Sequence, residues 1–139
     1  MTDSDLYRVL DANFNRLREG LRVIEEVVRL VKNDGESAAT LKSLRHAVAE
    51  CEMRIDRGRR LRARDSEGDV GRAGSAGLEG ERKDLADITA SNFKRCQEAA
   101  RTLEEFTKLV DVSVAEAVKE IRFRLYDMEK MVSVYPPKL

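Results

Sequence analysis

One stretch of the chain combines the residue types that phosphate chemistry requires. Residues 62–71 read RARDSEGDVG, so arginines, carboxylates and glycines occur within ten residues. Arginines can neutralise the charge of a transferring phosphoryl group, and carboxylates can hold magnesium or orient the attacking group. Glycines let the backbone approach a ligand closely. The candidates are Arg64, Asp65 and Asp69 for catalysis, the same two carboxylates for magnesium, and Gly68 and Gly71 for phosphate binding. The same composition is also typical of a solvated, flexible, charge-balanced loop, and this alternative stays open.

Several well-known site motifs are excluded. An EF-hand would have Gly in place of Val70 and Glu in place of Ala76. No Walker A, GxGxxG, HExxH or GxSxG sequence occurs anywhere in the chain. Cys51 and Cys96 stand singly, outside any CxxC or Cys/His cluster, so we expect reduced thiols.

A second set of polar residues occurs twice. Residues 11–31 and 90–110 match at an offset of 79, with nine of 21 positions identical. Ordinary residue frequencies would give roughly one or two matches. The identical pairs are Asn13/Asn92, Phe14/Phe93, Arg16/Arg95, Glu19/Glu98, Arg22/Arg101, Glu25/Glu104, Glu26/Glu105, Leu30/Leu109 and Val31/Val110. The repeat predicts that a half-molecule was duplicated and that its Asn, Arg and Glu residues were retained with the apolar positions.

On a helical wheel, two of the repeated residues fall on the apolar face. Asn13 is near its middle, and Arg16 is about 60° away, still inside the apolar arc. The same holds for Asn92 and Arg95. Because a buried arginine is rare unless it is paired or bound to an anion, we predict that these four residues bind phosphate in a cavity at the end of the bundle. The alternative is a buried Asn–Arg–Glu network that sets the register of the helices.

Other repeated or singular residues have simpler interpretations. The Arg22/Glu26 and Arg101/Glu105 sets are spaced as surface pairs along a helix. Cys96 replaces an apolar residue of the first copy and is predicted to lie in the core.

Helical periodicity predicts four long helices. They are expected over about residues 4–33, from 37 or 40 to 56, from 84 or 87 to 110, and up to about 132. Asp3 or Ser4 is the expected cap of the first helix, Gly35 its stop, and Ser113 with Glu116 a capping box for the last.

The helices predicted second and fourth also match, at an offset of 77. Lys42/Lys119, Arg45/Arg122 and Glu52/Glu129 are identical. The repeated unit is therefore a helical hairpin, over about 4–56 and about 84–132, with an Arg/Gly-rich loop at 57–82 between the copies. The sequence predicts one all-α domain over 1–139, a four-helix bundle with an internal pseudo-two-fold.

Composition narrows the class of protein. The chain has 139 residues, enough for one domain with a real core, and 26 basic against 26 acidic residues. A net charge of zero disfavours binding to nucleic acid or to an acidic membrane. No apolar run approaches the ~20 residues of a membrane span, and no signal peptide is visible, so we expect a cytoplasmic protein.

Several segments together resemble a known family. DANFNRLREGLRVIEEVVR, RARDSEGDVG, DLADITASNFKRCQEAARTLEEFTKL and IRFRLYDMEK are similar to a bacterial thiamine-pathway domain, found in front of thiamine-phosphate synthase or as a free protein. That family is regarded as an alternative hydroxymethylpyrimidine phosphate kinase. The resemblance implies phosphorylation of 4-amino-5-hydroxymethyl-2-methylpyrimidine phosphate to the diphosphate, with ATP and magnesium. It carries onto the candidate residues above and, with no role assigned, onto Glu19, Arg22, Glu98, Arg101, Arg122 and Arg124.

Two other functions fit the same sequence. The chain could be a non-catalytic module that binds thiamine-phosphate synthase and supports its assembly. It could also be a structural bundle that forms a homodimer through an exposed apolar strip.

Overall fold

The helices pair in hairpins that pack side by side. The computed structural model describes residues 1–73 and 80–133, and within these the chain is helical with no strand. The elements are α1 (Asp3–Glu26), which continues as the π-helical η1 (Val27–Val31), then α2 (Gly35–Met53), α3 (Arg57–Ala63), α4 (Leu85–Thr107) and α5 (Val112–Val132). The predicted all-α bundle of four long helices is therefore confirmed for the described residues.

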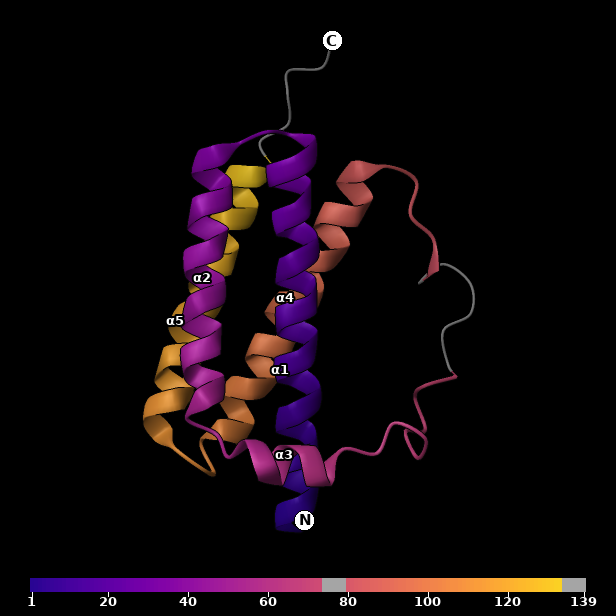
Figure 1. The fold of residues 1–139 in the computed structure, drawn as a ribbon, viewed down its shortest axis with the longest axis vertical. Helices are drawn as coiled ribbons and strands as arrows, with labels where there is room; N and C mark the ends of the chain where they lie inside the picture. The colour runs from indigo at the N-terminus through magenta and orange to yellow at the C-terminus, as the bar shows by residue number, and fades with distance from the viewer. Residues whose placement is uncertain (74–79, 134–139) are drawn as a thin grey trace.

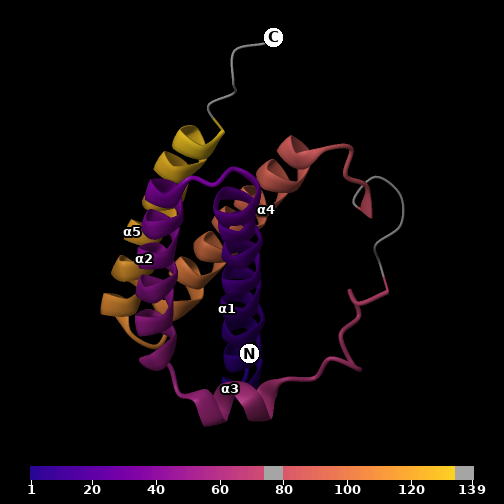
Figure 2. The same ribbon diagram turned by 45° about the horizontal axis from the view of Figure 1, so that its top comes forward.

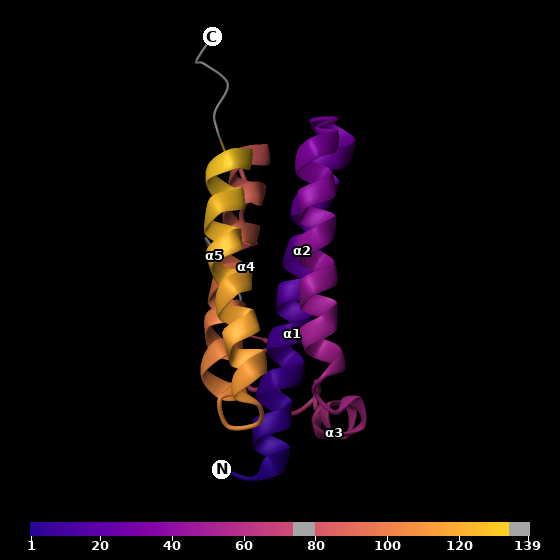
Figure 3. The same ribbon diagram turned by 90° about the vertical axis from the view of Figure 1, so that its left-hand side faces the viewer.

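The two hairpins are visible as separate pairs. Figure 3 shows α4 and α5 beside α1 and α2, with the short α3 across the end of the α1–α2 pair. α1 and α4 run in opposite directions and pack along each other, and α2 packs against α5 (Figures 1 and 2). None of the helices in the described residues is long and apolar enough to span a bilayer.

Helix ends differ from the predicted caps in three places. Thr2, rather than Asp3 or Ser4, caps α1, since its hydroxyl accepts from the Asp5 N–H and the Asp5 carboxylate accepts from the Thr2 N–H. This is a capping box shifted to the residue before the predicted ones.

The turn between α1 and α2 also differs. Asn33, not Gly35, takes the left-handed conformation, with φ of 52°. Asp34 then caps α2 by accepting from the Ser37 N–H, so the helix begins at Gly35 rather than at residue 37 or 40. The left-handed residue Asn33 is thus followed directly by Asp34, the cap of the next helix.

The cap of α5 was also wrongly predicted. Asp111 accepts from both the backbone N–H and the hydroxyl of Ser113. The predicted box from Ser113 to Glu116 does not form, because a carboxylate two residues earlier already engages Ser113.

The predicted loop over 57–82 begins as a helix. α3 is capped by Asp56 and occupies Arg57–Ala63. The Arg60 side chain is only 6% exposed, donates to Glu52 at 2.9 Å and lies over the Phe14 ring. Arginines are good helix formers, and this contact gives α3 a buried face, which the glycine-rich composition of the whole stretch did not reveal.

The core follows the predicted apolar faces. Phe14, Phe93 and Cys96 are fully buried, so the prediction that Cys96 lies in the core is confirmed. α1 and α4 approach each other closely at Gly20, where an added Cβ would lie 2.5 Å from the Cys96 Sγ. A small residue is therefore required at this crossing.

Buried carboxylates link the helices within each hairpin. Glu25 accepts from Arg45 at 2.9 Å in the first hairpin, and Glu104 accepts from Arg122 at 3.2 Å in the second. The repeat-equivalent residues thus make equivalent contacts, although the origin of the hairpins by duplication stays a prediction. The predicted surface pairs also form, Arg22 with Glu26 and Arg101 with Glu105.

Candidate functional site

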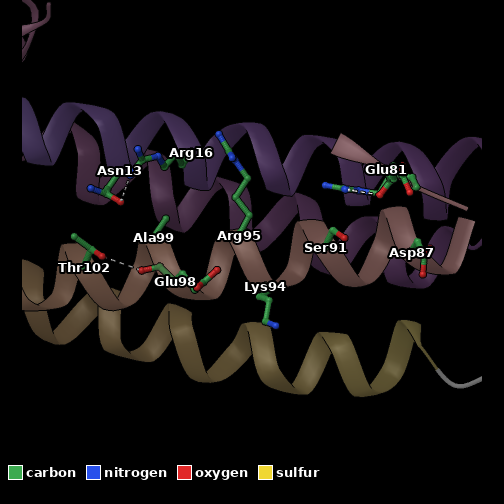
Figure 4. Close-up of a pocket in the computed structure, with 11 residues that line it drawn as sticks. Asn13, Arg16, Glu81, Asp87, Ser91, Lys94, Arg95, Glu98, Ala99 and Thr102 are labelled. Carbon is green, nitrogen blue, oxygen red and sulfur yellow. Dashed lines mark hydrogen bonds between the residues drawn. The ribbon is translucent and has the colours of Figure 1, made fainter. Parts of the chain in front are cut away.

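A groove runs along α1 and α4, with a volume of about 780 Å³. Figure 4 shows side chains from both helices on its walls, with Glu81 from the segment that precedes α4. Its lining residues are Asn13, Arg16, Glu81, Arg82, Asp87, Ser91, Lys94, Arg95, Glu98, Ala99 and Thr102. We call this cavity the α1–α4 groove.

Two predicted phosphate ligands, Arg16 and Arg95, both line the groove, but from its surface. Both side chains are exposed, so the prediction that they point into the bundle interior was wrong. The physical reason is that burying a guanidinium without a partner is expensive, and an arginine at the margin of an apolar face can reach water instead. In Figure 4 the Arg95 side chain extends from α4 toward α1, where Arg16 and Asn13 lie.

The two repeated asparagines are more deeply placed than the arginines. Asn13 is 5% exposed and donates to the Val9 carbonyl at 2.9 Å, while its amide oxygen accepts from Arg16 at 3.3 Å. Asn92 is half-buried and donates to the Ile88 carbonyl at 2.8 Å, but it does not line the groove. Asn13 therefore orients Arg16 for the groove.

Cationic residues outnumber carboxylates in the lining of the groove. Arg16 and Arg95 make no ion pair with a carboxylate in the described part of the chain, whereas Arg82 donates to the Glu81 carbonyl at 2.8 Å. Lys94 adds a further cation from α4, and its side chain points toward α5 (Figure 4). Guanidinium groups without an acidic partner favour an anionic ligand, and phosphate matches their bidentate geometry. Acidic groups also line the groove, and these are Glu81, Asp87 and Glu98.

The predicted catalytic loop residues lie outside this lining. Arg64 donates from Nε and Nη2 to the two carboxylate oxygens of Asp11, at 2.7 and 2.9 Å. This hydrogen-bonded contact with Asp11 raises the pKa of Arg64. The structure therefore does not bring Arg64 together with Arg16 or Arg95, because Arg64 fastens the chain after α3 onto α1.

The two candidate magnesium ligands, Asp65 and Asp69, accept hydrogen bonds from backbone N–H groups in local turns. One carboxylate oxygen of Asp65 accepts from the Gly68 N–H at 2.8 Å, and one of Asp69 accepts from the Gly71 N–H at 2.9 Å. A Cβ at Gly68 would collide with the Asp65 carboxylate, which explains the glycine there. Each carboxylate keeps its second oxygen for another partner.

Magnesium can be held by as few as two protein carboxylates when substrate phosphates complete its coordination. No group of three or more His, Cys, Asp or Glu suited to a metal occurs within residues 1–73 and 80–133. Asp65 and Asp69 fit only this sparse arrangement. Glu98 already lines the groove and offers one further carboxylate.

Sequence reasoning missed the buried acid Asp11. Its side chain is 4% exposed and faces Arg64 and, at 3.8 Å, Arg60. The signal was present, because Asp11 is the residue of the first copy that aligns with Ala90 in the second. An acid unique to one copy pairs here with the inter-hairpin segment, which is also unique.

The fold and groove define an all-helical protein with a cationic surface groove between two hairpins. Residues 8–131 match the model of the ThiD2 family, and the chain belongs to this family. No solved structure matches the chain.

The relatives found are much longer proteins. A thiamine-phosphate synthase from Gloeobacter violaceus is 43% identical over 122 residues, which are 88% of this chain and 35% of that protein. Those from Nostoc punctiforme and Rhodopirellula baltica are each 40% identical, over 89% and 86% of this chain and 34% and 32% of theirs. The chain spans about a third of the length of the curated relatives that it matches.

Proposed function

We propose that the chain acts in thiamine biosynthesis as a kinase that converts 4-amino-5-hydroxymethyl-2-methylpyrimidine phosphate to the diphosphate with ATP. The family membership and the names of the relatives support the pathway. One observation supports the chemistry, namely that Arg16 and Arg95 line one groove without an acidic partner in the described residues. A cytoplasmic location is part of the same proposal.

The reaction explains why cations matter more than a base. The attacking group is a phosphate oxygen that is already anionic near neutral pH, so no side chain has to remove a proton from it. The obstacle is repulsion between two negatively charged phosphates. Arg16 and Arg95 lower that repulsion, hold the two reacting groups in one groove and stabilise the charge of the transferring phosphoryl group.

Magnesium bound with the nucleotide would neutralise part of the phosphate charge. Asp65 and Asp69 are the carboxylates proposed from sequence, and Glu98 is one that the groove itself offers. The variants Asp69→Ala and Glu98→Ala distinguish these two possibilities. Only the substitution that removes a ligand of the metal should raise the magnesium concentration needed for half-maximal rate.

The test is a kinase assay on the purified chain with the pyrimidine monophosphate, ATP and magnesium. We expect diphosphate product, with a rate lowered about 100-fold or more in Arg16→Ala and Arg95→Ala. Arg22→Ala and Arg101→Ala are matched controls on the same helices, since these arginines pair with glutamates outside the groove. Absence of product with any nucleotide or metal would refute the kinase. Undiminished product in both groove variants would refute the site.

The coverage of the relatives favours a second candidate, a non-catalytic accessory module of thiamine-phosphate synthase. The chain matches about a third of proteins that carry that name. Co-elution with a separately produced synthase, together with faster synthase turnover and no kinase activity, would support this candidate. Light scattering on the chain alone would test the proposed homodimer.

A further inference from the structure

We infer that the α1–α4 groove is a diphosphate clamp, in which Arg16 holds one phosphate of a single diphosphate group and Arg95 holds the other. This inference deepens the proposed function, because it names the ligand of the same groove as the P–O–P group that the reaction forms.

The crossing of α1 and α4 places the two arginines on either side of one close contact. The Cys96 thiol donates to the Leu17 carbonyl at 3.6 Å, and a Cβ at Gly20 would lie 3.3 Å from the Asn92 carbonyl oxygen. As the sequence number rises on α1, it therefore falls on α4. Arg16 precedes Leu17 and Arg95 precedes Cys96, so the two guanidinium-bearing residues flank the point of close approach and line one groove.

The two arginines are also equivalent in the repeat, at the offset of 79. Two equivalent residues that face one groove from antiparallel helices are related by an approximate two-fold axis through that groove. A diphosphate has the same symmetry about its bridging oxygen. One guanidinium for each phosphate therefore matches both the charge and the symmetry of this ligand.

Both guanidinium groups keep most of their hydrogen-bonding capacity. Within the described residues, Arg16 donates to the Asn13 amide oxygen alone, and Arg95 has no hydrogen-bond or ion-pair partner. Glu98 lies one turn from Arg95 but makes no ion pair with it. The next repeated pair is different, because Arg22 and Arg101 are each held by glutamates of their own helix.

The experiment is calorimetric titration of the full chain with inorganic pyrophosphate and, separately, with inorganic phosphate at one ionic strength. We expect pyrophosphate to bind about ten-fold or more tightly than phosphate. Arg16→Ala and Arg95→Ala should each weaken pyrophosphate about ten-fold or more, by similar factors, and should leave phosphate binding much less changed. Arg22→Ala and Arg101→Ala should change neither affinity.

Equal affinity of the unmodified chain for the two anions would overturn the clamp. So would loss of pyrophosphate binding in only one of the two groove variants, because the ligand would then rest on one helix. Circular dichroism of each variant establishes that it is folded before titration. Pyrophosphate should be displaced by the pyrimidine diphosphate or by ADP, which identifies the source of the diphosphate, and displacement by neither would refute the clamp.

The titration uses no turnover, so its result is separate from that of the kinase assay. A clamp without kinase activity would refute only the proposed reaction. Kinase activity without preference for pyrophosphate would refute only the clamp.

Discussion

Neutralising Asp11 should loosen the attachment of the inter-hairpin segment to α1. In Asp11→Asn the side chain keeps its shape but loses the charge that two nitrogen atoms of Arg64 contact, at 2.7 and 2.9 Å. Removing one partner of a buried ion pair costs about 3–5 kcal/mol when the other charge stays buried. Here the penalty is smaller, because Arg64 is 44% exposed and regains water, and Arg60 keeps its contact with Glu52.

The expected loss in the free energy of unfolding is therefore about 2 kcal/mol, the range for a hydrogen bond to a charged group. For a chain of this size that loss lowers the Tm by about 6 °C. Urea and thermal unfolding, followed by circular dichroism, measure both quantities. Arg62→Ala is the matched control, since Arg62 is an exposed arginine two residues before Arg64, on α3.

A double-mutant cycle isolates the contact itself. Asp11→Asn combined with Arg64→Ala should show a coupling of about 1–2 kcal/mol, because the second substitution removes little once the first is present. If the two effects simply add, or if Asp11→Asn is no more destabilising than Arg62→Ala, then this ion pair does not anchor the segment.

Three further predictions follow from single contacts. Gly20→Ala and Cys96→Ala should be coupled favourably by about 1 kcal/mol in unfolding experiments, because the added methyl group at residue 20 meets the Cys96 Sγ; additive effects would contradict the close approach. Burial raises the pKa of the Cys96 thiol to about 12, so the folded chain should resist alkylation of Cys96 at pH 8, and rapid alkylation of the folded chain would contradict this. The stability of the fold should also fall as the pH rises from about 9 toward 12, because only the unfolded chain ionises this thiol in that range. Hydrogen bonds from Ser113 and Ser37 lower the pKa values of the capping carboxylates Asp111 and Asp34, so their stabilisation should be complete above about pH 4 and lost as the pH falls below it; acid unfolding curves unchanged in Asp34→Asn and Asp111→Asn would refute it.

Local pattern was enough for the helices but not for their ends. Apolar spacing predicted the four long helices, and the core position of Cys96 followed from its place in the repeat. Caps were displaced by one or two residues because several carboxylates and hydroxyls compete within one turn, and only the three-dimensional path of the chain decides which one reaches an N–H. α3 was missed because its buried face depends on Arg60 meeting Glu52 and Phe14.

The candidate site was also predictable from the sequence only in part. The repeat singled out Arg16 and Arg95, and the structure brings both to one groove, although at its surface rather than in the interior. The loop set around Arg64 was grouped with them on chemical grounds. It lies elsewhere because Asp11, 53 residues away in sequence, holds Arg64 on α1.

The sequence by itself therefore determined the all-helical class, the paired hairpins and the residues worth testing, because periodicity and repetition are properties of the chain alone. Only the tertiary structure decided which polar groups neutralise each other and which remain available to a ligand. A charged side chain can be buried with a partner, exposed to water or in contact with a ligand. Which of these states has the lowest free energy depends on neighbours that are distant in sequence. Arg64 found Asp11, whereas Arg16 and Arg95 remained in the groove without an acidic partner in the described residues.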